Sequence, residues 1–299
     1  MNILAIFTGG TISCSDRDGM LSPDGSNSYL LLNSRADVCF DTAAPYTILS
    51  ENLGERELTL LGDTVEENLK KDYDGIFIAH GTDTLQYSAA YLALRLGLSK
   101  IPVVLVAAAY PLFDSRSNGY ANFSAAVDFI AAKQGRGVFV SYKNSGDDRV
   151  TIHRGSELLP HAAYSDELNS MSGNEYGFVS HGRFVPNTEY VEHCAETGCN
   201  SRLNGHVLWL KAHPGMIYPD NLDGVKSVLL EGYHSGTLAT GSAELKAFCQ
   251  TAEQSKIPLY LTGCDSGFPY ESKLLFDELK ITVLPKMSPV TAYMRLWLS

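Results

Sequence analysis

The sequence predicts an α/β fold: a doubly wound parallel sheet at the N-terminus, followed by a second, smaller α/β domain. Short apolar runs recur along the 299 residues, separated by stretches with apolar residues at the three- and four-residue spacing of amphipathic helices. Residues 76–78 and 103–106 are apolar at consecutive positions, which is typical of strands covered on both faces. Such alternation indicates βαβ units on a mostly parallel sheet.

The N-terminal domain is predicted over residues 1–185. Its strands are expected at residues 3–7, 75–79, 103–107, 137–142 and 150–153, and its helices at 85–96 and 122–134. The last two strands should form an antiparallel ribbon, because residues 144–148 (NSGDD) favour a turn.

The pattern fails between about residues 166 and 205, which are rich in glycine and polar residues. We interpret this stretch as an excursion that ends in an interdomain linker at 186–205. Alternation then resumes, with strands expected at 206–210, 227–231, 258–262 and 281–284, and helices at 242–255, near 273–279 and from about 290. This predicts a C-terminal domain over 206–299.

Composition excludes several classes of protein. Asp and Glu exceed Lys and Arg by 34 to 23, a formal net charge of −11 that disfavours nucleic acid as a partner. No apolar run approaches the roughly 18 residues of a membrane helix, and no leader pattern opens the chain. The six cysteines are scattered without a CxxC pair. We expect a cytoplasmic protein with no membrane partner, no cofactor and no metal.

Two loops rich in glycine and hydroxyl groups follow predicted strands. TGGTI occupies residues 8–12 and HGTDT occupies residues 80–84. Ligands bind parallel sheets at the carboxyl ends of strands, and glycines there allow close approach to backbone N–H groups. A hydroxyl behind such a turn suits nucleophilic chemistry without a metal. Alternatively, the glycines only make turns and Thr11 and Asp83 cap helices. Neither loop has the spacing of a phosphate-binding loop or a GxSxG elbow.

TGGTI and HGTDT together resemble the two signatures of the bacterial-type L-asparaginase family, in its cytoplasmic branch. SNGYANF at 117–123 is similar to a further segment of that family, and LSENL at 49–53 to its substrate loop. The resemblance covers most of residues 1–160 and is weaker beyond. It implies a flavodoxin-like N-terminal sheet, a homodimer or homotetramer, and cofactor-free hydrolysis of the side-chain amide of L-asparagine to L-aspartate and ammonia.

The resemblance also implies catalytic roles. Thr11 matches the nucleophile that forms an acyl-enzyme, and Thr82 and Asp83 match two further members of its triad. The hydroxyl of a threonine needs a neighbouring group to take its proton before it becomes an effective nucleophile.

Substrate-binding positions carry over in the same way. Ser50 matches the serine that binds the substrate α-carboxylate, with Glu51 beside it, and Asp83 is expected to meet the α-amino group as well. Gly10 and Gly81 lie in the two loops where the backbone is expected to approach the substrate. An acid at Glu51 adds negative charge near the ligand, so glutamine, D-asparagine or another small amide remain alternative substrates.

Two positions depart from the family pattern. The triad lysine is expected about six residues after Arg154-Gly155, where Pro160 stands. Its role would pass to His161, to Lys143 on the adjacent ribbon, or to no residue. The activating tyrosine of the loop after TGGTI is also absent, since Met20 stands near its place. Tyr29 is the candidate to replace it, with residues 22–28 resembling a mobile lid.

Two other functions are considered. A binding or regulatory protein could keep this fold and turn an amino acid over poorly, which the missing lysine would favour. The amidase component of a tRNA-dependent amidotransferase shares the motifs. It would be expected to carry an extra N-terminal domain, for which a TGGTI beginning at residue 8 leaves no room.

Overall fold

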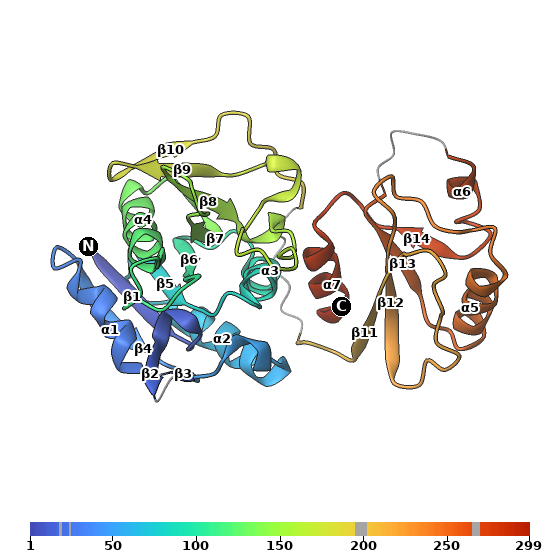
Figure 1. The fold of residues 1–299 in the computed structure, drawn as a ribbon, viewed down its shortest axis with the longest axis horizontal. Helices are drawn as coiled ribbons and strands as arrows, with labels where there is room; N and C mark the ends of the chain where they lie inside the picture. The colour runs from blue at the N-terminus through green and yellow to red at the C-terminus, as the bar shows by residue number, and fades with distance from the viewer. Residues whose placement is uncertain (18–19, 24, 195–201, 265–269) are drawn as a thin grey trace. The chain divides into compact units, whose positions relative to one another are not determined.

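Eight strands form the sheet of the first unit, in the order β10-β9-β8-β7-β6-β5-β1-β4 (Figure 1). The computed structural model describes residues 1–17, 20–23, 25–194, 202–264 and 270–299. The chain divides into two units, Met1–Asn200 and Ser201–Ser299. The predicted boundaries at 185 and 205 stay predictions, and residues 195–201 of the predicted linker lie outside the described residues.

Parallel pairing joins the five strands at one end of this sheet, and antiparallel pairing joins the others. The parallel strands are β4 (Cys39–Ala43), β1 (Asn2–Phe7), β5 (Gly75–Ala79), β6 (Pro102–Val106) and β7 (Gly137–Tyr142). The antiparallel extension consists of β8 (Val150–Arg154), β9 (Gly177–Ser180) and β10 (Arg183–Pro186). The predicted α/β class and the β7–β8 ribbon are confirmed.

Helices cover both faces of the sheet. Figure 1 shows α1 (Gly25–Asn33) and α4 (Gly119–Ala132) on one side of the strands, with α2 (Glu55–Asn68) and α3 (Leu85–Leu96) on the other. Every residue of β5, β6 and β7 is buried, as the apolar runs predict for strands covered on both faces. Aromatic rings fill the α4 side, where Phe77 and Phe123 lie 4.9 Å apart and Phe129 and Phe139 lie 4.8 Å apart.

The structure places two strands, which the sequence did not predict, in the stretch of residues 166–205 where the alternating pattern fails. β9 and β10 lie within it and pair antiparallel at the edge of the sheet. Pro186 at the end of β10 is compatible with an edge strand, because proline has no backbone N–H to donate to a neighbouring strand. A short hairpin of β2 (Cys14–Arg17) and β3 (Met20–Pro23) was also not predicted.

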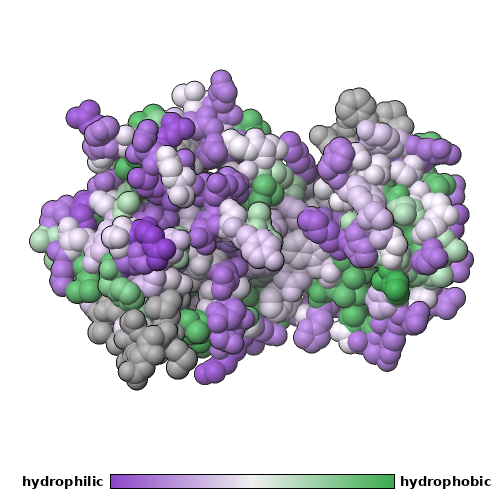
Figure 2. Space-filling model, viewed as in Figure 1, coloured by the Kyte–Doolittle hydropathy of each residue, from purple (hydrophilic) through white to green (hydrophobic). Residues whose placement is uncertain are grey.

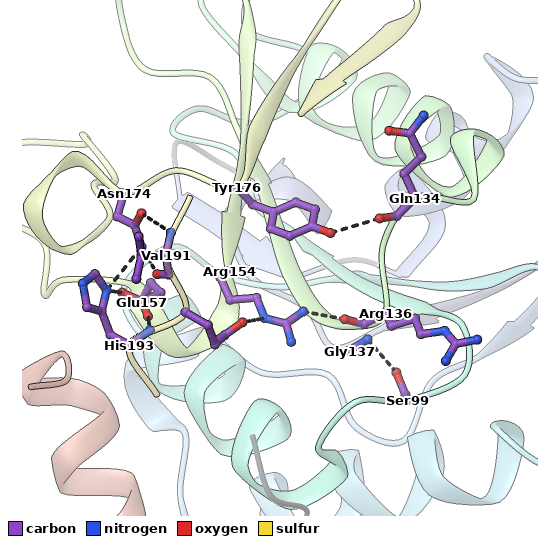
Figure 3. A network of polar contacts seen from close by, with 11 residues as sticks. Ser99, Gln134, Arg136, Gly137, Arg154, Glu157, Asn174, Tyr176, Val191 and His193 are labelled. Carbon is purple, nitrogen blue, oxygen red and sulfur yellow. Dashed lines mark hydrogen bonds and ion pairs between the residues drawn. The ribbon is translucent and has the colours of Figure 1, made fainter. Parts of the chain in front are cut away.

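A buried polar network holds the segment after β10 to the first unit (Figure 3). The carboxylate of Glu157, which is 1% exposed, accepts hydrogen bonds from the backbone N–H of His193 at 3.1 Å and from its Nδ1 at 3.0 Å. Asn174 exchanges two hydrogen bonds with the backbone of Val191. The Arg154 guanidinium donates to the carbonyl of Arg136 and lies 3.5 Å from Glu192. Residues 191–193 therefore pack as part of this unit.

The second unit is built on a four-stranded parallel sheet in the order β11-β12-β13-β14. Its strands are β11 (His206–Lys211), β12 (Val225–Glu231), β13 (Leu259–Thr262) and β14 (Ile281–Val283), and its helices are α5 (Ala243–Gln254), α6 (Glu271–Leu274) and α7 (Pro289–Trp297). Hydrophilic residues cover much of the viewed face of each unit, with smaller hydrophobic patches between them (Figure 2). Within the described ranges, no helix has the length and apolar character needed to cross a bilayer.

Candidate active site

Three loops meet at the carboxyl edge of the parallel strands in the first unit. They follow β1, β4 and β5, and backbone hydrogen bonds join them. The N–H of Thr8 donates to the carbonyl of Ala79 at 3.1 Å, and the N–H of Gly10 donates to the carbonyl of Ile48 at 2.9 Å. The N–H of Ile48 returns a bond to Thr8 at 3.1 Å. This is the sheet edge at which parallel α/β folds bind ligands.

The loops approach so closely that only glycine fits at their contact. A Cβ on Gly10 would lie 2.2 Å from the Cα of Gly81, and a Cβ on Gly81 would lie 2.3 Å from the Oγ of Ser50. Gly10 also has φ 76° and ψ 179°, a conformation that is almost confined to glycine. The two glycines thus explain how residues so far apart in sequence reach van der Waals contact.

This contact joins the loops that carry three of the predicted site residues. Thr11 follows Gly10 and opens the short 3-10 helix Thr11–Ser13, while Thr82 and Asp83 follow Gly81. Both threonines are half-buried and Asp83 is exposed. Thr82 and Asp83 line a cavity of about 480 Å³ together with His161.

The capping alternative for Thr11 and Asp83 finds no support in the helix termini. Gly10 is the N-cap of the 3-10 helix Thr11–Ser13, and Thr84 is the N-cap of α3. Thr84 does not cap with its side chain, because its Oγ1 donates to the carbonyl of Ser50 at 2.9 Å. That bond fastens the loop after β5 to the loop after β4, so the Thr84 hydroxyl joins two loops and does not cap the N-terminus of α3.

The predicted substrate anchors lie on the third loop. Ser50 and Glu51 begin the 3-10 helix Ser50–Asn52. Ser50 is buried against Gly81, whereas Glu51 is exposed. Burial of Cys14 raises the pKa of its thiol, and the charge of Glu51 adds to that effect. The Sγ of Cys14 donates to the carbonyl of Gly10 at 3.3 Å, so Cys14 supports the first loop as a protonated thiol.

His161 reaches the site from a distant part of the chain. Its Nδ1 lies 2.9 Å from the backbone carbonyl of Glu167, and a carbonyl only accepts, so Nδ1 carries a proton. Its Nε2 is shielded from solvent and has no hydrogen-bond partner among the described residues. An imidazole held in this tautomer presents an unshared electron pair at Nε2.

Lys143 lines a cavity that adjoins the one lined by Thr82 and Asp83, because residues 164–166 line both, and Tyr29 lies on α1 of the same unit. Lys143 lines a second cavity of about 700 Å³ with Asn118 and Tyr142, and its backbone N–H donates to Asn122 Oδ1 at 2.8 Å. The ring of Tyr29 lies 5.0 Å from that of Phe7, at the end of β1, and its side chain is 44% exposed. Gly19, beside the place sought for the loop tyrosine, lies outside the described residues.

Sequence reasoning missed two polar residues beneath the site. His80, the first residue of HGTDT, is 1% exposed and bonds through both ring nitrogens. Its Nε2 partner is Ser88 in α3, which is fully buried. The signal was present, because a histidine directly after an entirely apolar strand must find buried partners. Among the residues that the structure describes, no three His, Cys, Asp or Glu side chains gather as metal ligands do.

Comparison with known proteins gives a family and a fold. The family model described as "Asparaginase, N-terminal" matches residues 2–179. Solved L-asparaginase chains share the fold. That of Thermococcus kodakarensis has a TM-score of 0.80 at 21% identity and covers 100% of this chain and 92% of that one. A probable cytoplasmic L-asparaginase of Campylobacter jejuni has a TM-score of 0.77 at 18% identity and covers 99% and 94%.

Curated relatives by sequence carry another name, since they are subunits of glutamyl-tRNA(Gln) amidotransferases. The relative from Methanosphaera stadtmanae is 25% identical over 317 residues, which cover 99% of this chain and 71% of that protein. The relative from Methanococcus maripaludis is 29% identical over 206 residues, covering 62% and 47%. The aligned part thus spans between about half and 71% of these relatives' lengths.

Proposed function

We propose, from the premise that this chain belongs to the asparaginase family, that it hydrolyses the side-chain amide of L-asparagine to L-aspartate and ammonia. The family and its relatives make the chain an amidohydrolase-type enzyme. The single observation that carries the proposal is the contact of Gly10, Gly81 and Ser50, because it brings the loops with Thr11, Thr82 and Asp83 together at the carboxyl edge of the sheet.

Thr11 supplies the nucleophile in this proposal. Its hydroxyl oxygen attacks the side-chain amide carbon, its proton passes to a base, and the C–N bond breaks once the nitrogen has gained a proton and can leave as ammonia. The resulting ester between Thr11 and the aspartyl group is then attacked by water, which releases aspartate and restores the hydroxyl. Thr82 supports this exchange from the opposite loop, directly after the Gly10–Gly81 contact.

The substrate's charged end is bound by the neighbouring loops. The exposed carboxylate of Asp83 is available to the α-ammonium group, and the buried hydroxyl of Ser50 to the α-carboxylate. Binding both groups at once fixes the orientation of the amide relative to Thr11, which is worth several powers of ten in rate. Glu51, exposed beside Ser50, is placed to influence which amino acid is preferred.

We assign the base to His161 rather than to Lys143. His161 lines the same cavity as Thr82 and Asp83. Its Nδ1 is bonded to the Glu167 carbonyl, and its buried Nε2 has no hydrogen-bond partner among the described residues. Lys143 lines the second cavity, which shares residues 164–166 with the first but is not lined by Thr82 or Asp83. His161→Ala should lower kcat by about 10²-fold to 10⁴-fold, the contribution of general acid–base catalysis. If Lys143→Met removes turnover while His161→Ala retains it, the base is Lys143.

Ammonia release from L-asparagine, L-glutamine and D-asparagine by the purified chain tests the activity itself. Thr11→Ala should abolish release, and Thr11→Ser, which keeps a hydroxyl, should retain a measurable fraction. A chain that releases no ammonia but is stabilised against heat by asparagine or aspartate would instead be the binding or regulatory protein. Tyr29→Phe tests whether its hydroxyl takes part.

A second candidate function rests on the names of the curated relatives. In it the chain is one component of an amidotransferase that uses glutamyl-tRNA(Gln), and its amide hydrolysis serves transfer of the nitrogen. Ammonia release that occurs only in the presence of glutamyl-tRNA(Gln) and a second protein component would favour this function. A homodimer or homotetramer in the cytoplasm is our proposal for the free enzyme, and light scattering after size-exclusion chromatography measures the assembly.

A further inference from the structure

His80 is a buried polar residue that the proposed reaction does not use. It follows β5, and its backbone N–H donates to the carbonyl of Val106 on the adjacent strand at 2.8 Å. Its Nδ1 lies 2.8 Å from the carbonyl of Gly81, and its Nε2 lies 2.8 Å from the hydroxyl of Ser88. Ser88 is fully buried in α3, so the ring links the turn after β5 to the helix that follows it.

The partners determine where the ring proton lies. The Gly81 carbonyl can only accept, so Nδ1 must carry the proton and donate. Burial lowers the pKa of His80 to about 4, which keeps the ring neutral at pH 7. Nε2 of a neutral ring protonated at Nδ1 is an acceptor, and the Ser88 hydroxyl therefore donates to it. The direction of both bonds is thus fixed by chemistry.

Fixing the Gly81 carbonyl also fixes the peptide that follows it. The Gly81–Thr82 peptide is planar and trans, so the N–H of Thr82 points to the side opposite the carbonyl that His80 holds. Gly81 has no side chain to restrict its own torsions, and its contacts with Gly10 and Ser50 limit how closely the loops approach. His80 supplies the restraint on rotation that the glycine lacks.

We propose that His80 and Ser88 are a positioning pair for the reaction: they hold the Gly81–Thr82 peptide in one orientation, and so place Thr82 relative to Thr11. Its effect on kcat depends on the proposed function. Its geometric content, one ring tautomer and one peptide orientation, stands on the bonds of His80 alone.

A second buried histidine of the same unit provides a matched control. His153 in β8 is 2% exposed, and its Nδ1 lies 2.8 Å from the hydroxyl of Ser170. It pairs with Val140 in the antiparallel part of the sheet and does not line the cavity of Thr82 and Asp83. Substitutions of His153 therefore measure what losing a buried histidine–serine pair costs without moving the turn after β5.

Two replacements separate the two bonds of His80. Asparagine places an N–H near Nδ1 and keeps the bond to Gly81, whereas glutamine reaches the place of Nε2 and keeps only the bond to Ser88. We expect H80Q to lower kcat on the order of 10²-fold, the effect of a displaced catalytic group, with KM changed less than kcat. H80N should lose less than about tenfold in kcat. H153N and H153Q should lower kcat less than H80Q does, while lowering thermal stability as the His80 variants do.

Equal losses of kcat in H80N and H80Q, or a loss of the same size in the His153 variants, would overturn the positioning role. Nitrogen-15 NMR of the histidine rings and amide exchange at Thr82 test the geometry without any turnover. The geometry requires His80 protonated at Nδ1 and faster exchange at Thr82 in H80Q than in H80N. A ring protonated at Nε2, or equal exchange in both variants, refutes the proposal. If the wild-type chain releases no ammonia but shows these NMR results, the proposed function is refuted and the positioning of Thr82 stands.

Discussion

Replacing Gly10 with alanine tests the contact that brings the two motifs together. The new Cβ would lie 2.2 Å from Gly81 Cα and 2.4 Å from Gly81 N, and both are backbone atoms that cannot rotate away. At φ 76° and ψ 179° a residue with a side chain is also strained, by about 1–3 kcal/mol. Overpacking adds about 1–3 kcal/mol. We therefore expect G10A to lower the free energy of unfolding by about 2–6 kcal/mol.

Gly173 provides the control for backbone strain. Its φ is 65°, and a Cβ there would meet nothing within 4 Å, so G173A should cost only about 1–2 kcal/mol. Urea unfolding measures both free energies, and ammonia release from L-asparagine measures the site. Separation of the loops in G10A should lower kcat on the order of 10²-fold, whereas G173A should not change it. A G10A chain no less stable than G173A, with full turnover, would refute the close contact of the loops.

Three further predictions concern stability. H193A leaves the buried carboxylate of Glu157 without its imidazole partner and should lower the free energy of unfolding in urea by about 1–3 kcal/mol. F129A removes a ring with no exposed surface and should cost about 3–5 kcal/mol in the same assay; a smaller loss would mean that the neighbouring rings collapse into the space. Burial lowers the pKa of His80 to about 4 and that of His153 to about 3, so between these values and about 6.5 the unfolded chain binds more protons. Stability should thus be complete above about pH 6.5 and fall by up to about 3 kcal/mol per histidine on acidification to pH 4, a loss that H153Q should reduce.

The parts of the fold that could be predicted are those whose signal is local. β5, β6 and β7 are apolar at consecutive positions because helices cover both of their faces, so the sequence itself marks them. β9 and β10 are four residues each and pair at the edge of the sheet, where β8 supplies the partner and hydrophobic patterning is weak. Their formation depends on pairing with neighbouring strands that are far away in the sequence, so no local pattern in the sequence predicts them.

The same distinction holds for the candidate site. TGGTI and HGTDT could be found because each is a short stretch with its glycines and hydroxyls together, and the structure joins them through Gly10 and Gly81. His161 lies in the cavity with Thr82 and Asp83 because the chain after β8 turns back toward the site. A β-bridge between Leu158 and Ser170 holds that return segment. The pairing of His80 with Ser88 likewise exists only once α3 is packed against the end of β5.

Ammonia release from L-asparagine by the wild-type chain, T11S and T11A tests the central claim most directly. The proposed nucleophile requires turnover in the wild type, a reduced but measurable rate in T11S, and none in T11A beyond the uncatalysed reaction. All three chains should unfold at nearly the same urea concentration, because Thr11 is only half-buried. A T11A chain that is folded and releases ammonia at the wild-type rate would contradict the assignment of Thr11 as the nucleophile.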